Sequence, residues 1–212
     1  MAEMLDVYNA NRQHIGVADR NVVHTCGLWH KTVHCWIVLV SANEKPKLVF
    51  QRRSRKLMDN PGSLYTTASG HVSAGETLEI AFARESEQEI GLTAKINPIH
   101  LYETPWVADF KRTDGSLFVD RVFANVYYAE YNGALSDFKF NDGEVDDLTA
   151  IDLDDFIQFS TGKLDRPLMG LEYNGTDIRE VELSMADFVL NPGETIYGKY
   201  GSIADRIQAN TM

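Results

Sequence analysis

Cysteine is scarce in this sequence, which contains only Cys26 and Cys35 among 212 residues. Two thiols cannot form the set of disulfides that supports many small secreted proteins. The first sixteen residues also lack the basic stretch and apolar core of a secretory signal. A reducing compartment fits this composition best, so we expect a cytoplasmic protein.

Long apolar runs are absent as well. No segment approaches the roughly 18 consecutive apolar residues that a membrane-spanning helix needs. Basic residues are few, because 20 lysines and arginines face 31 aspartates and glutamates, for a formal net charge of −11. Such a charge repels nucleic acid and anionic membranes at long range. We therefore expect a small molecule as the partner, and neither nucleic acid nor a membrane.

Several segments rich in β-branched and aromatic residues predict strands. Residues 32–40 and 47–53 are two such segments, separated by a polar break, and they predict a hairpin. Residues 64–70 predict a short strand. Residues 98–104 and 120–131 predict two more strands, with an Asp-Gly turn between them.

A helical pattern occupies residues 77–90, where Thr77 is a plausible N-cap and Gly91 suits a left-handed C-terminal position. A second helix is expected to start near Asp152, and another near the C-terminus. Many strands with few helices predict an α+β fold, in layers around a mixed sheet.

The last fifty residues have too few apolar side chains to form a core of their own. We therefore expect residues 1–212 to form a single domain, with residues 160–212 as its C-terminal extension.

The segment GHVSAGETLEIAFARESEQEIGL, from Gly70 to Leu92, carries the strongest chemical signal. Glu85 and Glu89 are one helical turn apart and share a face, with Gln88 beside them. Hard divalent cations such as magnesium prefer oxygen ligands, so this pair suits a metal site. Two such acids can also form a solvated helix face, but the glycines and Arg84 at fixed offsets favour the metal site.

This segment resembles the Nudix box, in which glycine, glutamate, an arginine–glutamate pair and two further glutamates recur at fixed spacing before a final glycine. The residues in register here are Gly70, Glu76, Arg84, Glu85, Glu89, Gly91 and Leu92. Two positions depart from the motif. Ser86 occupies an aliphatic position, and Gln88 replaces a glutamate, which changes the expected number or affinity of bound metals.

The resemblance extends over roughly residues 6–156, to the branch of Nudix hydrolases close to isopentenyl-diphosphate isomerase. It implies an α/β/α sandwich and a hydrolase that acts on a diphosphate linked to another moiety, such as a nucleoside diphosphate. It implies Mg²⁺ or Mn²⁺ held by Glu85, Glu89 and Gln88. Glu144, on a later loop, matches a glutamate that completes the metal site or acts as base, although it can also be one acid among several in that loop.

The substrate phosphate needs cationic or polar partners. Arg52, Arg53 and Arg55 lie in the short stretch QRRSRK, which forms either an anion-binding pocket or a solvated turn. Beside the metal-binding glutamates, we expect these arginines to grip the outer phosphate, and His71 to contact a phosphate or the metal shell. Glu76 is expected, with Arg84, to hold the turn against the helix.

Two alternatives remain open from the sequence. The related isomerase uses three histidines, which His24, His34 and His71 can match, together with a catalytic cysteine and a pair of carboxylates. Here Ser69 stands at the cysteine position, and Asp120 is the one carboxylate near the expected pair. Since isomerisation needs a proton donor and an acceptor, we favour the hydrolase.

The other alternative is a binding module that retains the fold without turnover, such as a nucleotide sensor. The substitution at Gln88 is the feature that supports this interpretation. A homodimer is the expected oligomeric state, by analogy with the fold.

Overall fold

The computed structural model describes residues 3–92, 96–112, 114–140, 143–190 and 193–211. These residues form a nine-stranded sheet in which β3 and β8 run parallel and the other neighbours antiparallel. The main strand order is β11 (Ile178–Leu183), β10 (Leu168–Tyr173), β9 (Val145–Asp152), β4 (Glu44–Arg53), β3 (His30–Ser41), β8 (Leu117–Tyr131) and β7 (Ile99–Lys111). Two short strands complete it, β5 (Leu64–Tyr65) on β4 and β6 (Ala68–His71) on β3. The predicted mixed sheet is confirmed.

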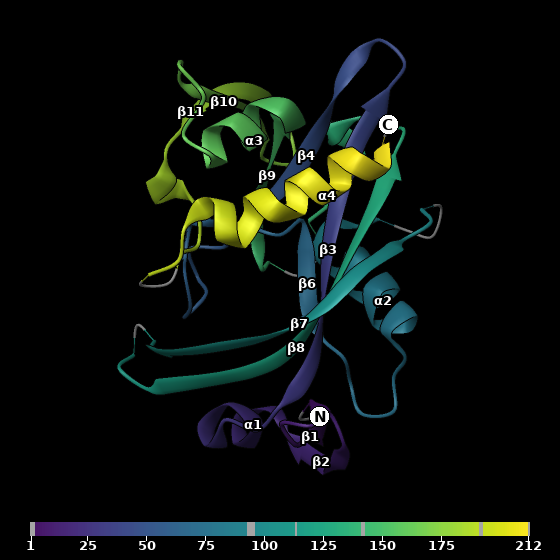
Figure 1. Cartoon of the computed structure of the whole chain (residues 1–212), viewed down its shortest axis with the longest axis vertical. Coiled ribbons are helices and arrows are strands. Elements are labelled where there is room, and N and C mark those ends of the chain that lie inside the picture. Colours follow the sequence, from purple (N-terminus) through teal and green to yellow (C-terminus); the bar gives the residue numbers. More distant parts are fainter. Residues whose placement is uncertain (1–2, 93–95, 113, 141–142, 191–192, 212) are drawn as a thin grey trace.

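Helices cover both faces of this sheet (Figure 1). Along β3, Val33 and Cys35 belong to the core cluster that contains α2 (Leu78–Ile90), whereas Trp36 and Val38 belong to the cluster on the other face. The second cluster includes apolar residues of α3 (Leu153–Ser160) and α4 (Ser202–Thr211). This alternation follows from the two-residue period of a strand, and it confirms the α/β/α sandwich.

Helix α2 begins and ends where the sequence predicts. The Thr77 hydroxyl accepts a hydrogen bond from the backbone N–H of Ile80 (3.4 Å), and Gly91 has a left-handed φ of 65°. Ala81, Phe82 and Ile90 are buried in the core. The same helix also buries Glu85 and Glu89, so part of its polar side faces protein and not solvent.

The predicted strand over residues 64–70 is interrupted. The side chain of Thr67 turns inward, where its hydroxyl donates to the carbonyl of Val49 and accepts from the N–H of Ile37 (2.9 Å). These bonds substitute for sheet pairing at that position, and so divide the segment into β5 and β6.

The hairpin of β7 and β8 is much longer than predicted. Its first strand starts at Ile99 as expected but continues to Lys111, through Pro105. The Asp114–Gly115 turn lies at its tip, next to Thr113, which is outside the described residues. In Figure 1 this hairpin curves away from α3 and α4, towards α1 and the other N-terminal elements.

Several elements have no counterpart in the predictions. They are β1 (Met4–Tyr8), β2 (His14–Asp19), α1 (Arg20–Cys26), the strands β10 and β11, the 3₁₀ turns Leu135–Asp137 and Met185–Asp187, and a π-helical turn at Tyr197–Gly201. The strands β10 and β11 extend the sheet, and α4 packs on it, so much of the tail shares the main core. No helix in the described ranges is long and apolar enough to cross a membrane.

The two cysteines have opposite environments. Cys26 ends α1 and is exposed, whereas Cys35 is fully buried in the core. Burial raises the pKa of the Cys35 thiol well above its usual value. Cys35 is therefore a core residue and not a reactive thiol.

Candidate active site

A cavity of about 650 Å³ lies beside α2, β6 and the N-terminal elements. It collects most of the residues that the sequence singled out. The residues predicted for a hydrolase site that line it are Arg53, Gly70, His71, Arg84, Glu85, Gln88, Glu89 and Glu144. Those considered for an isomerase that also line it are His24, His34, Ser69 and Asp120. Arg52 and Arg55 are not among its lining residues.

Glu85 and Glu89 converge on two adjacent residues of β6. The Glu89 carboxylate accepts hydrogen bonds from the backbone N–H of Ser69 (2.9 Å) and from the Gln51 amide (3.1 Å). The Glu85 carboxylate lies directly against Gly70, where an added Cβ would come within 2.0 Å of its Oε1. Only glycine leaves room for a carboxylate at this point. Both acids are buried, so neither points into bulk solvent.

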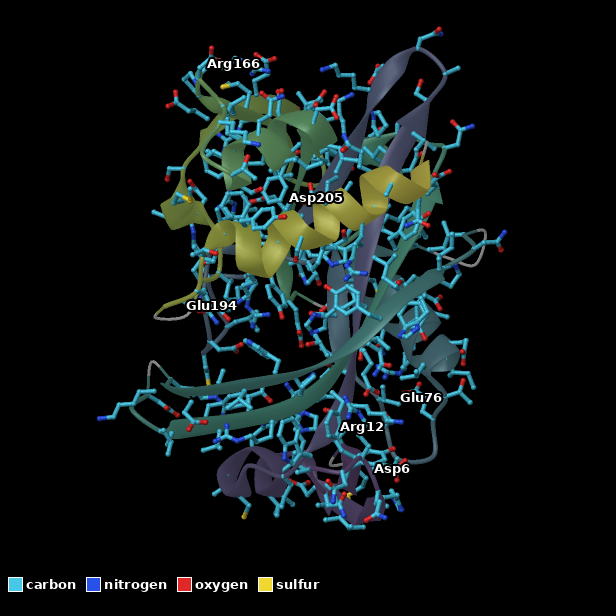
Figure 2. All side chains as sticks on the ribbon, in the orientation of Figure 1. Asp6, Arg12, Glu76, Arg166, Glu194 and Asp205 are labelled. Carbon is cyan, nitrogen blue, oxygen red and sulfur yellow. The ribbon has the colours of Figure 1, made fainter. Side chains whose placement is uncertain are left out.

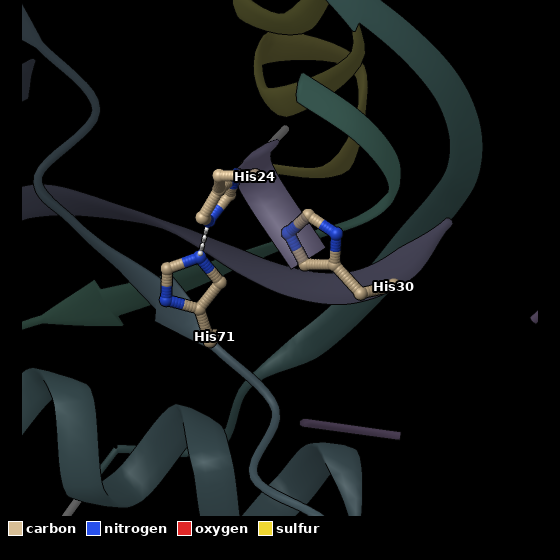
Figure 3. Close-up of side chains that lie close together, drawn as sticks. All are labelled: His24, His30 and His71. Carbon is tan, nitrogen blue, oxygen red and sulfur yellow. Dashed lines mark hydrogen bonds between the residues drawn. The ribbon is translucent and has the colours of Figure 1, made fainter. Parts of the chain in front are cut away.

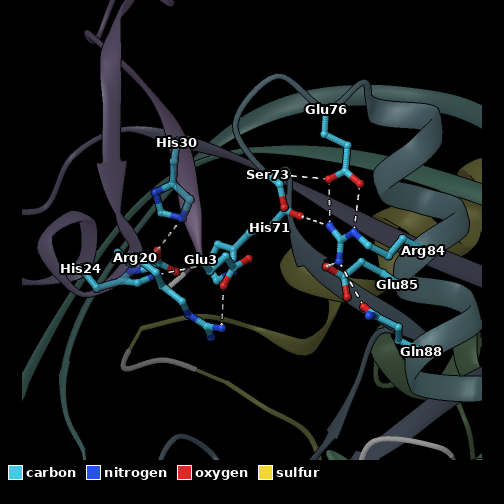
Figure 4. Close-up of polar contacts among 11 residues, drawn as sticks. Glu3, Arg20, His24, His30, His71, Ser73, Glu76, Arg84, Glu85 and Gln88 are labelled. Carbon is cyan, nitrogen blue, oxygen red and sulfur yellow. Dashed lines mark hydrogen bonds and ion pairs between the residues drawn. The ribbon is translucent and has the colours of Figure 1, made fainter. Parts of the chain in front are cut away.

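Arg84 connects the turn to the helix (Figure 4). Its Nε and Nη2 donate to the two oxygens of Glu76 at 2.9 Å, a bidentate pair. Its Nη2 also donates to the carbonyl of His71 (2.8 Å). Its Nη1 donates to Glu85 (2.6 Å) and to Gln88 (3.2 Å). Arg84 thus fixes the Glu85 carboxylate and positions the amide of Gln88 beside it.

The electrostatic environment of Glu85 disfavours its charge. Burial raises the pKa of Glu85 to about 7, the Arg84 guanidinium opposes that rise, and the charges of Glu3 and Glu144 add to it. Several acids therefore face one small volume from the helix, the N-terminus and a later loop. A cation among them would relieve this repulsion, so the donor set fits a hard divalent ion with oxygen ligands.

The three candidate arginines have different positions. Arg52 is directed into a buried network, where its Nε donates to Asp147 (3.0 Å) and its Nη2 lies 3.6 Å from Glu172. Arg55 is exposed outside the cavity wall. Arg53 lines the cavity, and Asp59 accepts from its guanidinium at 2.6 Å. Of the three, Arg53 is placed to meet a ligand in this cavity.

Three histidines meet beside the same cavity (Figure 3), and two of them, His24 and His71, line it. They are His24 of α1, His30 at the start of β3 and His71 at the end of β6, and one nitrogen of each lies within 4.8 Å of the others. His24 Nε2 is 3.0 Å from His71 Nε2. His34, which the sequence grouped with His24 and His71, is not part of this set. His30 takes that place.

Burial keeps these imidazoles neutral. It lowers the pKa of His24 to about 3, that of His30 to about 4, and that of His71 well below its usual value. Asp120 lies 3.5 Å from His24 Nδ1 and 3.7 Å from His30 Nε2, and burial raises its pKa to about 7.

These close approaches are not hydrogen bonds, because His24 Nδ1, His30 Nε2 and Asp120 Oδ1 have no hydrogen-bond partner among the described residues. Neutral imidazoles with an adjacent carboxyl group are the donor set that zinc-type ions prefer. The His24, His30 and His71 cluster therefore fits a second metal, of a different class from an ion at Glu85 and Glu89.

Sequence reasoning missed other residues that line the cavity. Glu3 and Arg20 come from the N-terminal elements, and Arg112 comes from the β7–β8 hairpin. Their positions depend on how distant segments pack, so no local pattern marks them. His30 is not a lining residue of this cavity, but it did carry a signal in the sequence, because it lies on the same face of β3 as His34.

The chain matches the NUDIX domain family over residues 30–169. It belongs to the NUDIX family. An uncharacterised Nudix hydrolase of Clostridium acetobutylicum is 28% identical over 199 residues, which cover 94% of this chain and 92% of that protein. An isopentenyl-diphosphate Delta-isomerase of Citrobacter koseri is 30% identical over 123 residues, which cover 57% of this chain and 62% of that protein.

Solved structures agree on the fold of this NUDIX protein. A protein of Deinococcus radiodurans superimposes with a TM-score of 0.55 at 21% identity, covering 76% of this chain and 90% of that one. A MutT protein of Methanosarcina mazei gives a TM-score of 0.51 at 18% identity, covering 86% and 95%. The predicted membership of the Nudix hydrolases is confirmed, and it supports a pyrophosphohydrolase activity.

Proposed function

We propose that this NUDIX protein is a metal-dependent hydrolase of a diphosphate linked to a second moiety, of the nucleoside diphosphate type. The observation that carries the proposal is the convergence of Glu85 and Glu89 on Ser69 and Gly70, inside a cavity that arginines also line. The buried acids supply oxygen ligands, and the arginines supply charge for the phosphates.

Each residue has a role that follows from its position. Glu85 and Glu89, with Gln88 and Glu144 at the rim, would hold Mg²⁺ or Mn²⁺, which supplies Lewis acidity and an activated water when bound. Glu144 or Glu89 takes the proton of the attacking water. Arg53 binds the outer phosphate, while Arg84 fixes the Glu85 carboxylate through its Nη1.

A panel of nucleoside diphosphate-linked and prenyl diphosphate compounds would test this function, with phosphate or monophosphate release as the readout. We expect turnover with magnesium or manganese and none with EDTA. Glu89→Gln should lower kcat by about 100-fold or more. Turnover that persists in EDTA would contradict the mechanism, and thermal stabilisation by a ligand without product would identify a binding module.

A second candidate is supported by the three-histidine cluster with Asp120, since the related isomerase also uses three histidines. Ser69 argues against it, because a hydroxyl is a far weaker acid than the thiol that the isomerase needs at that position. Incubation with isopentenyl diphosphate and zinc or magnesium, followed by analysis of the allylic isomer, separates the two functions. We expect no isomer to form.

A further inference from the structure

A second cavity, of about 780 Å³, adjoins the candidate active site. It lies between the β7–β8 hairpin, the middle of β3 and the segment from Gly193 to Arg206 that leads into α4. Five aromatic side chains contribute to its wall, namely Trp36, Tyr65, Tyr102, Trp106 and Tyr200. We call it the aromatic cavity. His34, Tyr65 and Trp106 line both cavities, so one extended ligand can reach from the acids into the aromatic cavity.

Trp106 is held in place by a charged pair. Glu194 accepts from the Trp106 indole N–H (3.3 Å) and from Lys199 Nζ (2.9 Å), and Figure 2 labels Glu194 in the segment before α4. The Lys199 ammonium also lies 5.1 Å from the centre of the Trp106 ring and 5.9 Å from that of Tyr65. These contacts fix two aromatic rings at the border of the two cavities before any ligand arrives.

The C-terminal segment that provides Lys199 is itself firmly packed. The Tyr200 hydroxyl donates to the carbonyl of Val189 (2.8 Å). Gly201 approaches α3 so closely that an added Cβ would lie 2.5 Å from the Ser160 hydroxyl. The turn is π-helical, a conformation that is frequent at functional sites. The wall of the aromatic cavity is thus preorganised.

The charge of the aromatic cavity is balanced. Lys199 and Arg206 are its cations, and Glu103 and Glu194 are its carboxylates. A balanced wall has no excess of cations for another phosphate. Four arginines line the first cavity, namely Arg20, Arg53, Arg84 and Arg112, and a metal held by its acids would offset their negative charge. The aromatic cavity is therefore suited to an uncharged, planar group that stacks on rings and has polar edges.

We propose that the aromatic cavity binds the base of a nucleoside diphosphate-type substrate, with Trp106 as a stacking surface, while the diphosphate lies at Glu85 and Glu89. This inference rests on the proposed function and assigns the part of the chain that meets the base of its substrate. Trp106 is a specificity residue here, and Lys199 and Glu194 are positioning residues that act through it.

Calorimetric titration of ADP and of inorganic pyrophosphate, in magnesium, tests the proposal. The Glu85→Gln background prevents turnover during the titration. Adding Trp106→Leu should weaken ADP binding by roughly 10- to 100-fold, because a stacked base is lost. Pyrophosphate has no base, so its affinity should stay within about threefold. Trp29→Leu is the matched control, since Trp29 stacks on Phe123 outside both cavities and should change neither affinity.

Trp106→Phe retains an aromatic face and should recover most of the ADP affinity, which separates stacking from a folding defect. The proposal is overturned if ADP binds equally well to the Trp106→Leu protein, if both ligands weaken together, or if ADP does not bind at all. Steady-state kinetics keep the two proposals apart. If ADP binding depends on Trp106 but no compound is hydrolysed, the base site is supported and the proposed function is refuted. If the protein is a hydrolase and Trp106→Leu leaves its KM unchanged, the proposed function is supported and the base site is refuted.

Discussion

Replacing Gly70 with alanine should disable catalysis while leaving the fold intact. The added Cβ would lie 2.0 Å from Glu85 Oε1, 2.1 Å from Cδ and 2.5 Å from Oε2, whereas ordinary contact begins at 3.4 Å. The carboxylate must therefore move by at least 3.4 − 2.0 = 1.4 Å. A displacement of about 1 Å in a catalytic group costs on the order of 100-fold in rate, or about 2.7 kcal/mol. We expect kcat to fall by at least about that factor.

The assay measures kcat on the best diphosphate substrate and the unfolding temperature of each variant. Gly115→Ala is the control for glycine loss, because its Cβ would meet nothing within 4 Å at the hairpin tip. It should cost about 1 kcal/mol of stability, from its positive φ, and no activity. If Gly70→Ala acts through Glu85, the Gly70→Ala/Glu85→Gln double variant should be no slower than Glu85→Gln alone. A Gly70→Ala protein with full kcat would refute the reasoning.

Three further predictions follow from the same contacts. Acid should destabilise the protein. The pKa values of His24 and His30 in the folded protein, about 3 and 4, lie below the unfolded value of about 6.5. The contribution of the two neutral imidazoles to the free energy of unfolding is therefore complete above pH 6.5 and is lost as pH falls towards 4. At pH 5 the free energy of unfolding should have fallen by about 2 kcal/mol for each histidine. Denaturant unfolding at several pH values should show that the stability of the His24→Gln/His30→Gln double variant depends less on pH. Arg52→Ala should cost about 3–5 kcal/mol in urea unfolding, with KM unchanged, since it leaves the buried Asp147 carboxylate without its guanidinium partner. Arg53→Ala should instead raise KM by roughly 10- to 100-fold, and an equal effect of both arginines on KM would contradict their assignment. Arg84→Lys should lower kcat and leave KM nearly constant, because a lysine cannot bind Glu76 in a bidentate manner while also reaching Glu85.

Local patterns in the sequence were sufficient for the elements that carry the glutamates. Helix α2 has its cap at Thr77, its end at Gly91 and a fixed period, so the common face of Glu85 and Glu89 follows from geometry. The alternation along β3 likewise predicts which residues face each core. These properties depend on neighbours within one element, which a sequence displays directly.

The histidine cluster shows where such patterns stop. His30 and His34 share a face of β3, about 13 Å apart along the strand. His71 lies opposite Thr32, midway between His30 and His34. The pairing of β6 with β3 therefore does not decide which of these two histidines joins His71 in the cluster. The choice is made by α1, which carries His24 to the start of β3. No local pattern predicted α1, because a helix of seven residues depends on packing for its stability.

The arginines illustrate the same limit. Arg52 and Arg53 are neighbours on β4, so their side chains point to opposite faces. Only the position of β9 shows that Arg52 faces Asp147, its direct partner in the sheet register. The short strands β10 and β11 were missed for a related reason, because they gain stability from extending an existing sheet, and β11 buries only Leu183.

The contrast between the two thiols makes this protein convenient to label. Cys26 is exposed at the end of α1, two residues from His24, whereas Cys35 is sealed in the interior. A maleimide dye should therefore attach at one position in the folded chain, without any engineered cysteine. Titrating such a conjugate with zinc would report directly on whether the imidazoles of His24, His30 and His71 capture an ion.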